Sequence, residues 1–393
     1  VGGFAVRHAV FLAWRNLIAG RLRAAILVGC LTVAVSLPIV MHLLVSRFQE
    51  QLTRRAEATQ LIVGATGSRF DLTLHALYFE SDAPGEITMR EATEIGETGL
   101  ATPIPLYAMF RADRFRIVGT TAGYHRYRRL KVARGEGMKR IGDCILGATV
   151  ATSLGLSPGD KLTSEPENVL DPAGSYPLRM RVNGVLSPTG SPDDSVVFVS
   201  LETAWIIAGR GHGHQNPGDN SHSPVEGEEE GAFATVESFT EVTDENEHSF
   251  HFHGRREDLP LTAILIDAPD ERAETLLMGR YLARDDATIL EPPLIIEQLM
   301  QLVFRVERFL DVATLALLST TTVLVLLVFA LSLRLRQREI QTLFKLGCCR
   351  FMIARILFAE LAIIGLASAL LVAVVSLAAL RFGSQLFESL LLS

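Results

Sequence analysis

The chain has 393 residues, a formal net charge of −7 and a hydrophobic fraction of 48%. This length accommodates more than one structural unit. The apolar residues are concentrated in three windows without Asp, Glu, Lys or Arg, each of roughly 20 residues, which is the helix length needed to cross a bilayer core. Because buried helices of soluble proteins keep a polar stripe, the composition argues against a wholly soluble protein. The windows are Ala24–Val45, Val312–Leu333 and Leu361–Leu380.

The first apolar window follows Arg21 and Arg23, as the core of a signal peptide would. Its length exceeds the roughly 7–15 residues of such a core, and no small-x-small cleavage site follows Val45. We therefore expect an uncleaved anchor. The predicted fold class is an integral membrane α-helical protein with three transmembrane helices and a large extracytoplasmic mixed α+β domain between the first and the second.

The charges predict the orientation of these spans. Arginines and no acidic residue precede Ala24, and basic residues dominate Arg334–Arg355. The positive-inside rule places both flanks in the cytoplasm. Residues 46–311 contain 26 basic and 41 acidic residues, a net charge of −15, and are expected outside. In chain order we expect a cytoplasmic flank, three spans with an outer domain between the first two, a cytoplasmic loop or helix, and a short tail. Their predicted bounds are 1–23 for the flank, 24–45, 312–333 and 356–380 for the spans, 46–311 for the outer domain, 334–355 for the loop or helix and 381–393 for the tail.

Residues 46–311 combine helical and strand patterns. "QEQLTRRAEATQ" (Gln49–Gln60) predicts a helix that continues out of the first span. "YPLRMRVNGVL" (Tyr176–Leu186) alternates with period 2 and predicts a half-buried strand. We expect an α+β domain split into two lobes. Further predicted elements are strands in Leu61–Ser68, Phe115–Thr121 and Leu259–Pro269, a strand followed by a short helix in Asp193–Gly209, and helices at Gly147–Leu154, Asp270–Ala283 and Ile289–Val312.

Three stretches together resemble the MacB/FtsX-type permeases of ABC transporters. They are the N-terminal span, "LGATVATSLGLSPGD" with "RMRVNGVL" in the outer domain, and "RQREIQTLFKLGCCRFMIARILFAEL" after the second span. The resemblance implies a location in the bacterial inner membrane, with the large domain between the first two spans in the periplasm as a periplasmic core domain. It also implies that the loop after the second span is a coupling helix seated on a cytoplasmic ATPase.

The basic loop can form a short amphipathic helix that ends at Gly347. Such a helix can lie on acidic lipid headgroups or dock on a protein, and the resemblance favours the ATPase. The chain has no G-x-x-x-x-G-K-[ST] motif, so we expect no bound cofactor here, no enzymatic activity and ATP on a separate subunit. By the resemblance, the residues that couple the loop to the ATPase would be Arg338, Glu339, Leu343, Lys345, Leu346 and Gly347.

Permeases of this kind work in pairs, so we expect a second copy, as a homodimer or heterodimer. Gly365 and Ala369 have the small-x-x-x-small spacing that allows close helix packing, either between copies or within one chain. Family members normally have a fourth span, and the tail at 381–393 is too short to supply one.

A histidine-rich insertion at 211–254 holds six of the ten histidines around the acidic "EGEEEG". Imidazole and carboxylate groups are common zinc ligands, so the insertion is a candidate zinc site. The alternative is a solvated polar loop. The candidate ligands are His212, His214, His222, His248, His251 and His253.

Three other positions have simpler interpretations. His75 is expected to pack rather than to bind a metal. "YHRYRRLK" (Tyr124–Lys131) mixes aromatic and basic residues, and in an acidic exported domain it predicts a surface patch near lipid or a partner, with no nucleic acid bound. Glu360 is expected at the inner rim of the third span, where burial of a charge costs less than at mid-bilayer.

The leading functional hypothesis is a permease that couples ATP hydrolysis in the cytoplasm to movement of the outer domain. The cargo would be a lipoprotein, a peptide, an amphiphile or a zinc-linked periplasmic carrier protein. One alternative is an FtsX-like regulatory scaffold, and another is a membrane-anchored metal sensor whose basic loop contacts only lipid.

Overall fold

The computed structural model describes residues 2–165, 177–212, 240–243, 246–252, 254–282, 284–335, 337, 341–342, 345 and 350–391. The chain forms two compact units. The helical unit consists of Val1–Glu50 and Met300–Ser393, and the α+β unit consists of Gln51–Leu299.

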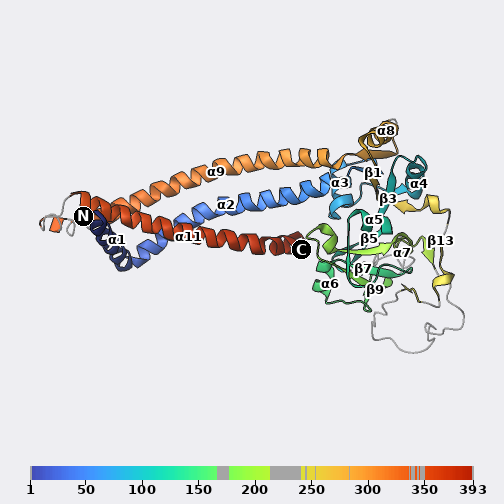
Figure 1. Cartoon of the computed structure of the whole chain (residues 1–393), viewed down its shortest axis with the longest axis horizontal. Coiled ribbons are helices and arrows are strands. Elements are labelled where there is room, and N and C mark those ends of the chain that lie inside the picture. Colours follow the sequence, from blue (N-terminus) through green and yellow to red (C-terminus); the bar gives the residue numbers. More distant parts are fainter. Residues whose placement is uncertain are drawn as a thin grey trace, which may run out of the picture. The chain divides into compact units, whose positions relative to one another are not determined.

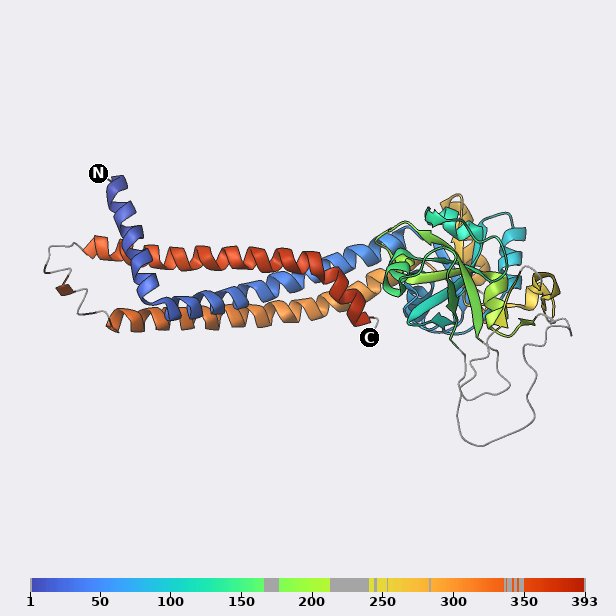
Figure 2. The same ribbon diagram turned by 90° about the horizontal axis from the view of Figure 1, so that it is seen from below.

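The helical unit contains long helices that run side by side (Figures 1 and 2). They are the first part of α2 (Arg21–Glu57), most of α9 (Pro292–Leu335) and α11 (Arg350–Leu391). The shorter helix α1 (Gly2–Ala19) crosses them at a steep angle in Figure 2. Among the described residues, three helices are long and apolar enough to cross a membrane, at Arg21–Glu57, Arg308–Leu331 and Phe351–Arg381. The sequence predicted only a flank where α1 lies. This helix buries Ala9 and Ala13 and packs against α11.

The α+β unit is built on one sheet, so the prediction of two lobes was wrong. The strand order is β12-β9-β7-β10-β5-β3-β15-β1-β16, with β4 paired to β5, and β6 and β8 paired to β9. Helices α3, α4, α6 and α7 pack on its strands, and the strands are visible at the centre of the unit in Figure 1. The strands of this sheet are β1 (Leu61–Ala65), β3 (Thr102–Tyr107), β4 (Arg111–Ala112), β5 (Phe115–Thr120), β6 (Val132–Gly135), β7 (Asp143–Leu146), β8 (Lys161–Thr163), β9 (Leu178–Leu186), β10 (Val196–Ser200), β12 (Thr240–Glu241), β15 (Ala263–Asp267) and β16 (Ala287–Leu290).

The remaining elements surround the sheet. Two short ladders join β2 (Ile87–Thr88) to β14 (Pro260–Leu261) and β11 (Gly211–His212) to β13 (His251–Phe252). The helices are α3 (Arg69–Tyr78), α4 (Met89–Glu97), α5 (Ala122–Tyr127), α6 (Ala148–Leu154), α7 (Leu201–Ile207) and α8 (Glu271–Tyr281), with the 3₁₀ turns η1 (Pro192–Ser195), η2 (Glu247–Ser249) and η3 (Arg256–Asp258).

Local sequence signals explain most of these elements, and the mixed α+β prediction is confirmed. In β9, Leu178, Met180 and Val182 are fully buried, as the period-2 pattern predicted. Helix α6 closes on Gly155 in the left-handed conformation. Helix α8 begins after Asp270, whose side chain accepts a hydrogen bond from the Ala273 backbone N–H.

One predicted helix boundary was wrong. The helix expected from Ile289 begins at Pro292, because Ile289 and Leu290 pair with Val63 and Ile62 of β1 as the end strand β16. This pairing joins segments far apart in the sequence, so no local pattern reveals it.

The packing of α7 on β5 depends on Gly119. A Cβ atom at this position would lie 2.4 Å from Cβ of Ala204 and 3.3 Å from the carbonyl oxygen of Tyr107. Both neighbours belong to a buried core around Trp205, whose indole N–H donates to the Pro260 carbonyl oxygen at 2.8 Å. The helix therefore approaches the strand as closely as a glycine allows.

Gly119→Ala should lower the free energy of unfolding of the α+β unit by about 1–3 kcal/mol, because the added methyl overpacks this contact. Thermal unfolding of the full chain in detergent, followed by near-UV circular dichroism, measures the loss. The matched control is Gly279→Ala in α8, where a Cβ meets nothing within 4 Å and stability should stay level or rise by up to about 1 kcal/mol. Equal midpoints for the two variants would contradict the close approach of α7.

Candidate functional site

Of the six predicted coupling residues, Lys345 lies within the described residues. Its backbone is helical and its side chain is exposed. Arg338, Glu339, Leu343, Leu346 and Gly347 lie outside the described residues. The coupling role of this loop therefore stays a prediction.

The predicted zinc ligands are only partly described. His248 and His251 are exposed, His212 is placed by its backbone in β11, and His214, His222 and His253 lie outside the described residues. Strands β11 and β13 are antiparallel, and their register sets His212 opposite His251. Within the part of the chain that the structure describes, no group of three or more His, Cys, Asp or Glu side chains could hold a metal ion.

The buried face of α11 lies beside the predicted small-residue pair. Ala369 is exposed and Gly365 is half-buried. The buried positions recur at every fourth residue, at Glu360, Ile364, Ser368, Val372 and Ser376. Packing of Gly365 and Ala369 against a second copy stays a prediction.

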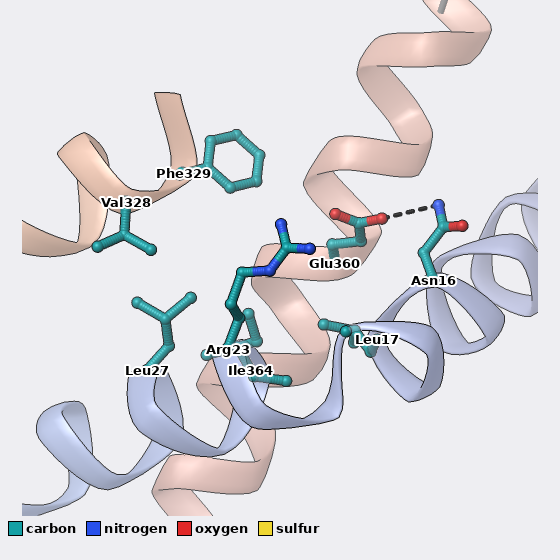
Figure 3. A pocket seen from close by; sticks show the side chains of 10 residues that line it. Asn16, Leu17, Arg23, Leu27, Val328, Phe329, Glu360 and Ile364 are labelled. Carbon is teal, nitrogen blue, oxygen red and sulfur yellow. Dashed lines mark hydrogen bonds between the residues drawn. The ribbon is translucent and has the colours of Figure 1, made fainter. Parts of the chain in front are cut away.

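Glu360 forms part of a polar cluster inside the helical unit. The Asn16 side-chain amide of α1 donates a hydrogen bond to its carboxylate at 2.9 Å, and Arg23 of α2 extends toward the same carboxylate (Figure 3). The three side chains line a cavity of about 40 Å³ whose other walls include Leu27 and Phe329. Glu360 was predicted at a membrane rim, and it is only 7% exposed. Since an unpaired buried carboxylate is costly, the cluster fixes α1 and the start of α2 to α11.

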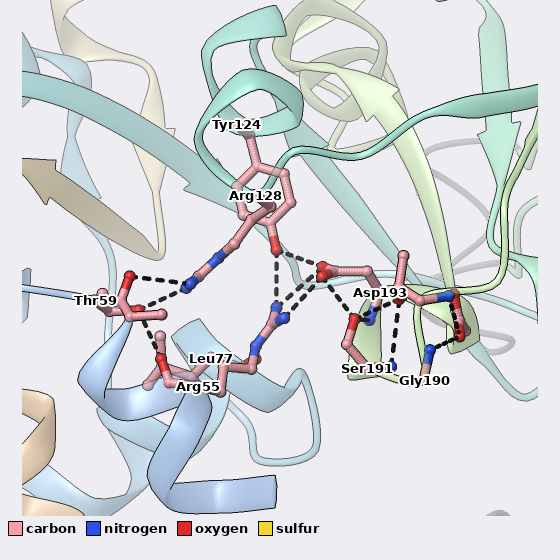
Figure 4. Close-up of polar contacts among 11 residues, drawn as sticks. Arg55, Thr59, Leu77, Tyr124, Arg128, Gly190, Ser191 and Asp193 are labelled. Atoms are coloured by element: carbon pink, nitrogen blue, oxygen red, sulfur yellow. Dashed lines mark hydrogen bonds and ion pairs between the residues drawn. The ribbon is translucent and has the colours of Figure 1, made fainter.

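A second buried cluster holds the far end of α2 within the α+β unit (Figure 4). Arg55, in the last turn of α2, forms a bidentate ion pair with Asp193 of η1, with Nη1–Oδ2 at 2.7 Å and Nη2–Oδ1 at 3.0 Å. Tyr124 of α5 donates to Asp193 Oδ1 at 2.6 Å and accepts from Arg55 Nη2 at 2.9 Å. Arg55 Nε also donates to the carbonyl oxygen of Leu77. We call Arg55, Tyr124 and Asp193 the α2 anchor.

The α2 anchor is desolvated. Arg55 is 8% exposed, Asp193 1% and Tyr124 0%. Burial raises the pKa of Tyr124, so its hydroxyl keeps its proton and donates. Burial also opposes ionisation of Asp193, but the charge and hydrogen bonds of Arg55 outweigh it and lower the pKa of Asp193 from 3.8 to about 2. Because the folded-state pKa lies below the unfolded one, this contribution to stability is complete above about pH 4 and is lost as the pH falls toward 2.

Further hydrogen bonds hold the end of α2 around the anchor. Tyr78 donates to the Leu52 carbonyl oxygen at 2.6 Å, and Arg128 Nη2 donates to Thr59 Oγ1 at 2.7 Å. The side-chain amide of Gln60 donates to the Ala268 carbonyl oxygen at 2.8 Å and accepts from the Ala268 backbone N–H at 2.7 Å. The helix end is therefore attached to several separate segments of the unit.

This arrangement corrects the prediction for Tyr124–Lys131. Tyr124 is fully buried, Tyr127 donates to the Ala58 carbonyl oxygen at 3.1 Å, and Arg128 binds Thr59. A large part of the predicted surface patch thus packs against the end of α2. His75 is 1% exposed, as the packing interpretation predicted, with Nδ1 2.8 Å from the Ser81 carbonyl oxygen.

Arg55 was not predicted from the sequence, because it forms part of a polar helical stretch. Leu52, Ala56 and Thr59 are buried on the same helical face. Their spacing of three and four residues around Arg55 was the available signal that this arginine points inward.

A family model of the MacB-like periplasmic core domain matches residues 24–244, which is more than half of the chain. The chain belongs to the MacB-like family. The predicted resemblance to MacB/FtsX-type permeases of ABC transporters is thereby confirmed. Members of this family are transporter components, and the match to a periplasmic domain supports an extracytoplasmic position for the α+β unit.

Solved structures of similar proteins include two extracytoplasmic domains. The periplasmic region of MacB from Actinobacillus actinomycetemcomitans is 11% identical, with 62% of this chain and 92% of that chain covered and a TM-score of 0.33. The extracellular domain of the noncanonic ABC-type transporter YknZ from Gram-positive bacteria is 11% identical, with coverages of 59% and 99% and a TM-score of 0.32. No curated protein matches this MacB-like chain.

Asp193→Asn should lower the free energy of unfolding by about 3–5 kcal/mol, because it leaves the Arg55 charge buried without its counterion. Denaturant unfolding of the full chain at pH 7 measures the loss. Asp258→Asn is the matched control, since Asp258 pairs with Arg90 at 2.7 Å with both side chains nearly half exposed. That variant should lose less than about 1 kcal/mol. Similar losses of unfolding free energy in the two variants would show that the buried ion pair contributes no more to stability than the exposed one.

Proposed function

We propose that the chain is the permease subunit of an ABC transporter that passes ATP-driven motion from the cytoplasm to its outer domain. The observation that supports this most directly is the continuity of α2, a single helix from Arg21 to Glu57. It contains an apolar window long enough for a membrane and ends in the α2 anchor. A helix has a fixed rise of about 1.5 Å per residue, so an axial shift at one end reaches the other.

The anchor suits this role because it leaves the helix end little freedom. A bidentate arginine–carboxylate pair fixes both distance and orientation. Further hydrogen bonds are made before Arg55 in the sequence, at Leu52, and after it, at Thr59 and Gln60. After the α+β unit, the chain continues into α9, which is also a single helix from Pro292 to Leu335 and contains a second apolar segment.

At the cytoplasmic side, the proposed input is the basic loop Arg334–Arg355. By resemblance to MacB/FtsX-type permeases, this loop would sit on a separate ATPase that carries the ATP. A second permease copy would complete the assembly, and the remaining basic side chains would lie against acidic membrane lipid. Work would then be done on cargo held by the outer domain, such as a lipoprotein, a peptide, an amphiphile or a metal carrier.

The combined change Arg338→Glu and Lys345→Glu should reduce association with the ATPase at least about tenfold, because it places acidic charges in the proposed contact. Co-elution of the two subunits from native membranes and vanadate-sensitive ATP hydrolysis are the measurements. Lys131→Glu, an exposed position of the α+β unit, is the control and should keep full association.

Asp193→Asn distinguishes motor binding from transmission. It should leave ATPase association intact and weaken the ATP-dependent change in hydrogen exchange of the α+β unit. Unchanged ATPase association after the charge reversal of the loop would contradict the proposal. An ATPase complex in which the hydrogen exchange of the α+β unit does not change with ATP would favour a static scaffold.

We also propose that the histidine-rich insertion captures zinc. The backbone register of β11 and β13 supports this, because it brings His212 and His251, from the two separate histidine-rich stretches, to paired positions. Paired residues in an antiparallel ladder have Cβ atoms about 4.5–5.5 Å apart, which is close enough for two imidazoles to reach one ion. Zinc held here would be loaded transiently or handed to a carrier.

Replacing both His212 and His251 by Ala should weaken zinc binding by the full chain at least about tenfold, a loss typical of a damaged metal site. Competition with a zinc-sensitive dye measures the affinity. His8→Ala in α1, far along the sequence from the insertion, should leave it unchanged. Equal zinc affinity in wild type and double variant would reduce the insertion to a solvated polar loop.

A further inference from the structure

A charged cavity of about 210 Å³ lies in the α+β unit, over strands β7, β8, β9 and β12. It is separate from the α2 anchor. Four basic side chains line it, together with three carboxylates. The basic residues are Arg140, Lys161, Arg179 and Arg181, and the acidic ones are Asp143, Glu241 and Glu247.

The register of the sheet brings the basic residues together. Arg179 and Arg181 are two residues apart on β9, so they lie on one face, opposite the buried Leu178 and Met180. Lys161 of β8 is paired with Arg181. Three cations from two neighbouring strands therefore share one face of the sheet.

The buried carboxylate of Asp143 holds some of these basic residues in place. It is 1% exposed, and its Oδ1 accepts from Arg181 Nε at 3.1 Å and Nη2 at 2.8 Å. Its Oδ2 accepts from the backbone N–H groups of Lys139 and Arg140, each at 3.2 Å. The buried carboxylate thus orients the Arg181 guanidinium and the backbone that presents Arg140.

Glu241 has a different position. It is 28% exposed, accepts a hydrogen bond from Lys161 and lies 4.0 Å from Arg179 Nη1. Glu247 accepts from the Ile141 backbone N–H at 3.3 Å. Four cations against three carboxylates leave the cavity with net positive charge, although residues 46–311 as a whole carry −15.

We propose that this cavity binds a small multivalent oxyanion, a carboxylate or phosphate compound. Arginine forks bind such groups through two parallel hydrogen bonds, and the cavity offers three arginines and a lysine converging from different segments. Glu241 acts as an internal counterion that the ligand displaces from Lys161 and Arg179. The site lies on the outer domain and does not depend on coupling to an ATPase.

The test is calorimetric titration of the full chain in detergent with succinate and, separately, with inorganic phosphate. Arg179→Gln should weaken binding about tenfold, because it removes a charged hydrogen-bond donor. Glu241→Gln should tighten binding about threefold or more, because it removes the competing carboxylate while keeping the shape of the side chain. Arg90→Gln, at the exposed Arg90–Asp258 pair, is the control and should bind as the wild type does.

Partial unfolding would weaken binding and cannot make it tighter. The titration of Glu241→Gln therefore still tests the proposal if Arg179→Gln folds poorly. Preference for succinate over phosphate identifies a carboxylate ligand, and the reverse preference identifies a phosphate ligand. The proposal is overturned by a wild type that shows no saturation up to about 10 mM of either anion, by equal losses in Arg179→Gln and Arg90→Gln, or by a Glu241→Gln variant that binds no tighter.

Discussion

The ion pair between Arg55 and Asp193 is the constraint on which the placement of the end of α2 in the α+β unit depends. Moving two charges out of water costs several kcal/mol for each ion, and only close geometry with further hydrogen bonds repays it. Tyr124 and the Leu77 carbonyl oxygen supply those bonds. A hydrophobic pair would hold a helix end equally firmly but would tolerate rotation. The bidentate pair therefore specifies one orientation of α2 relative to η1 and β10.

Local sequence patterns predicted most of the elements of the α+β unit and little of their assembly. The alternation in β9 and the Asp270 cap of α8 depend on neighbours in the sequence, so they were visible. The pairing of β16 with β1 joins residues more than 200 positions apart. The local sequence at Ile289 and Leu290 is compatible with a helix or a strand. Only the pairing with the distant strand β1 determines that these residues form a strand. The single sheet in place of two lobes has the same origin.

The candidate sites show the same division. The family resemblance came from motifs in "LGLSPGD" and "REIQTLFKLGC", whereas the α2 anchor has no motif, because Arg55 and Asp193 are 138 residues apart. Tyr124 and Arg128 resembled a surface patch since composition does not tell a buried tyrosine from an exposed one. Zinc was inferred from histidine content, and the register of His212 with His251 adds a geometric reason that composition could not supply.

Polar clusters hold α2 near both of its ends. Near its start, Arg23 lines a cavity with Asn16 and Glu360, and near its end Arg55 is bound to Asp193. The intervening helix is apolar and contains Pro38, which removes one backbone hydrogen bond and favours a bend. Under the proposed function, a helix held at both ends would carry an axial shift, and Pro38 would be the place where it bends. Polar side chains hold both ends of α2, whereas the segment between them is apolar over a length that suits a membrane-crossing helix.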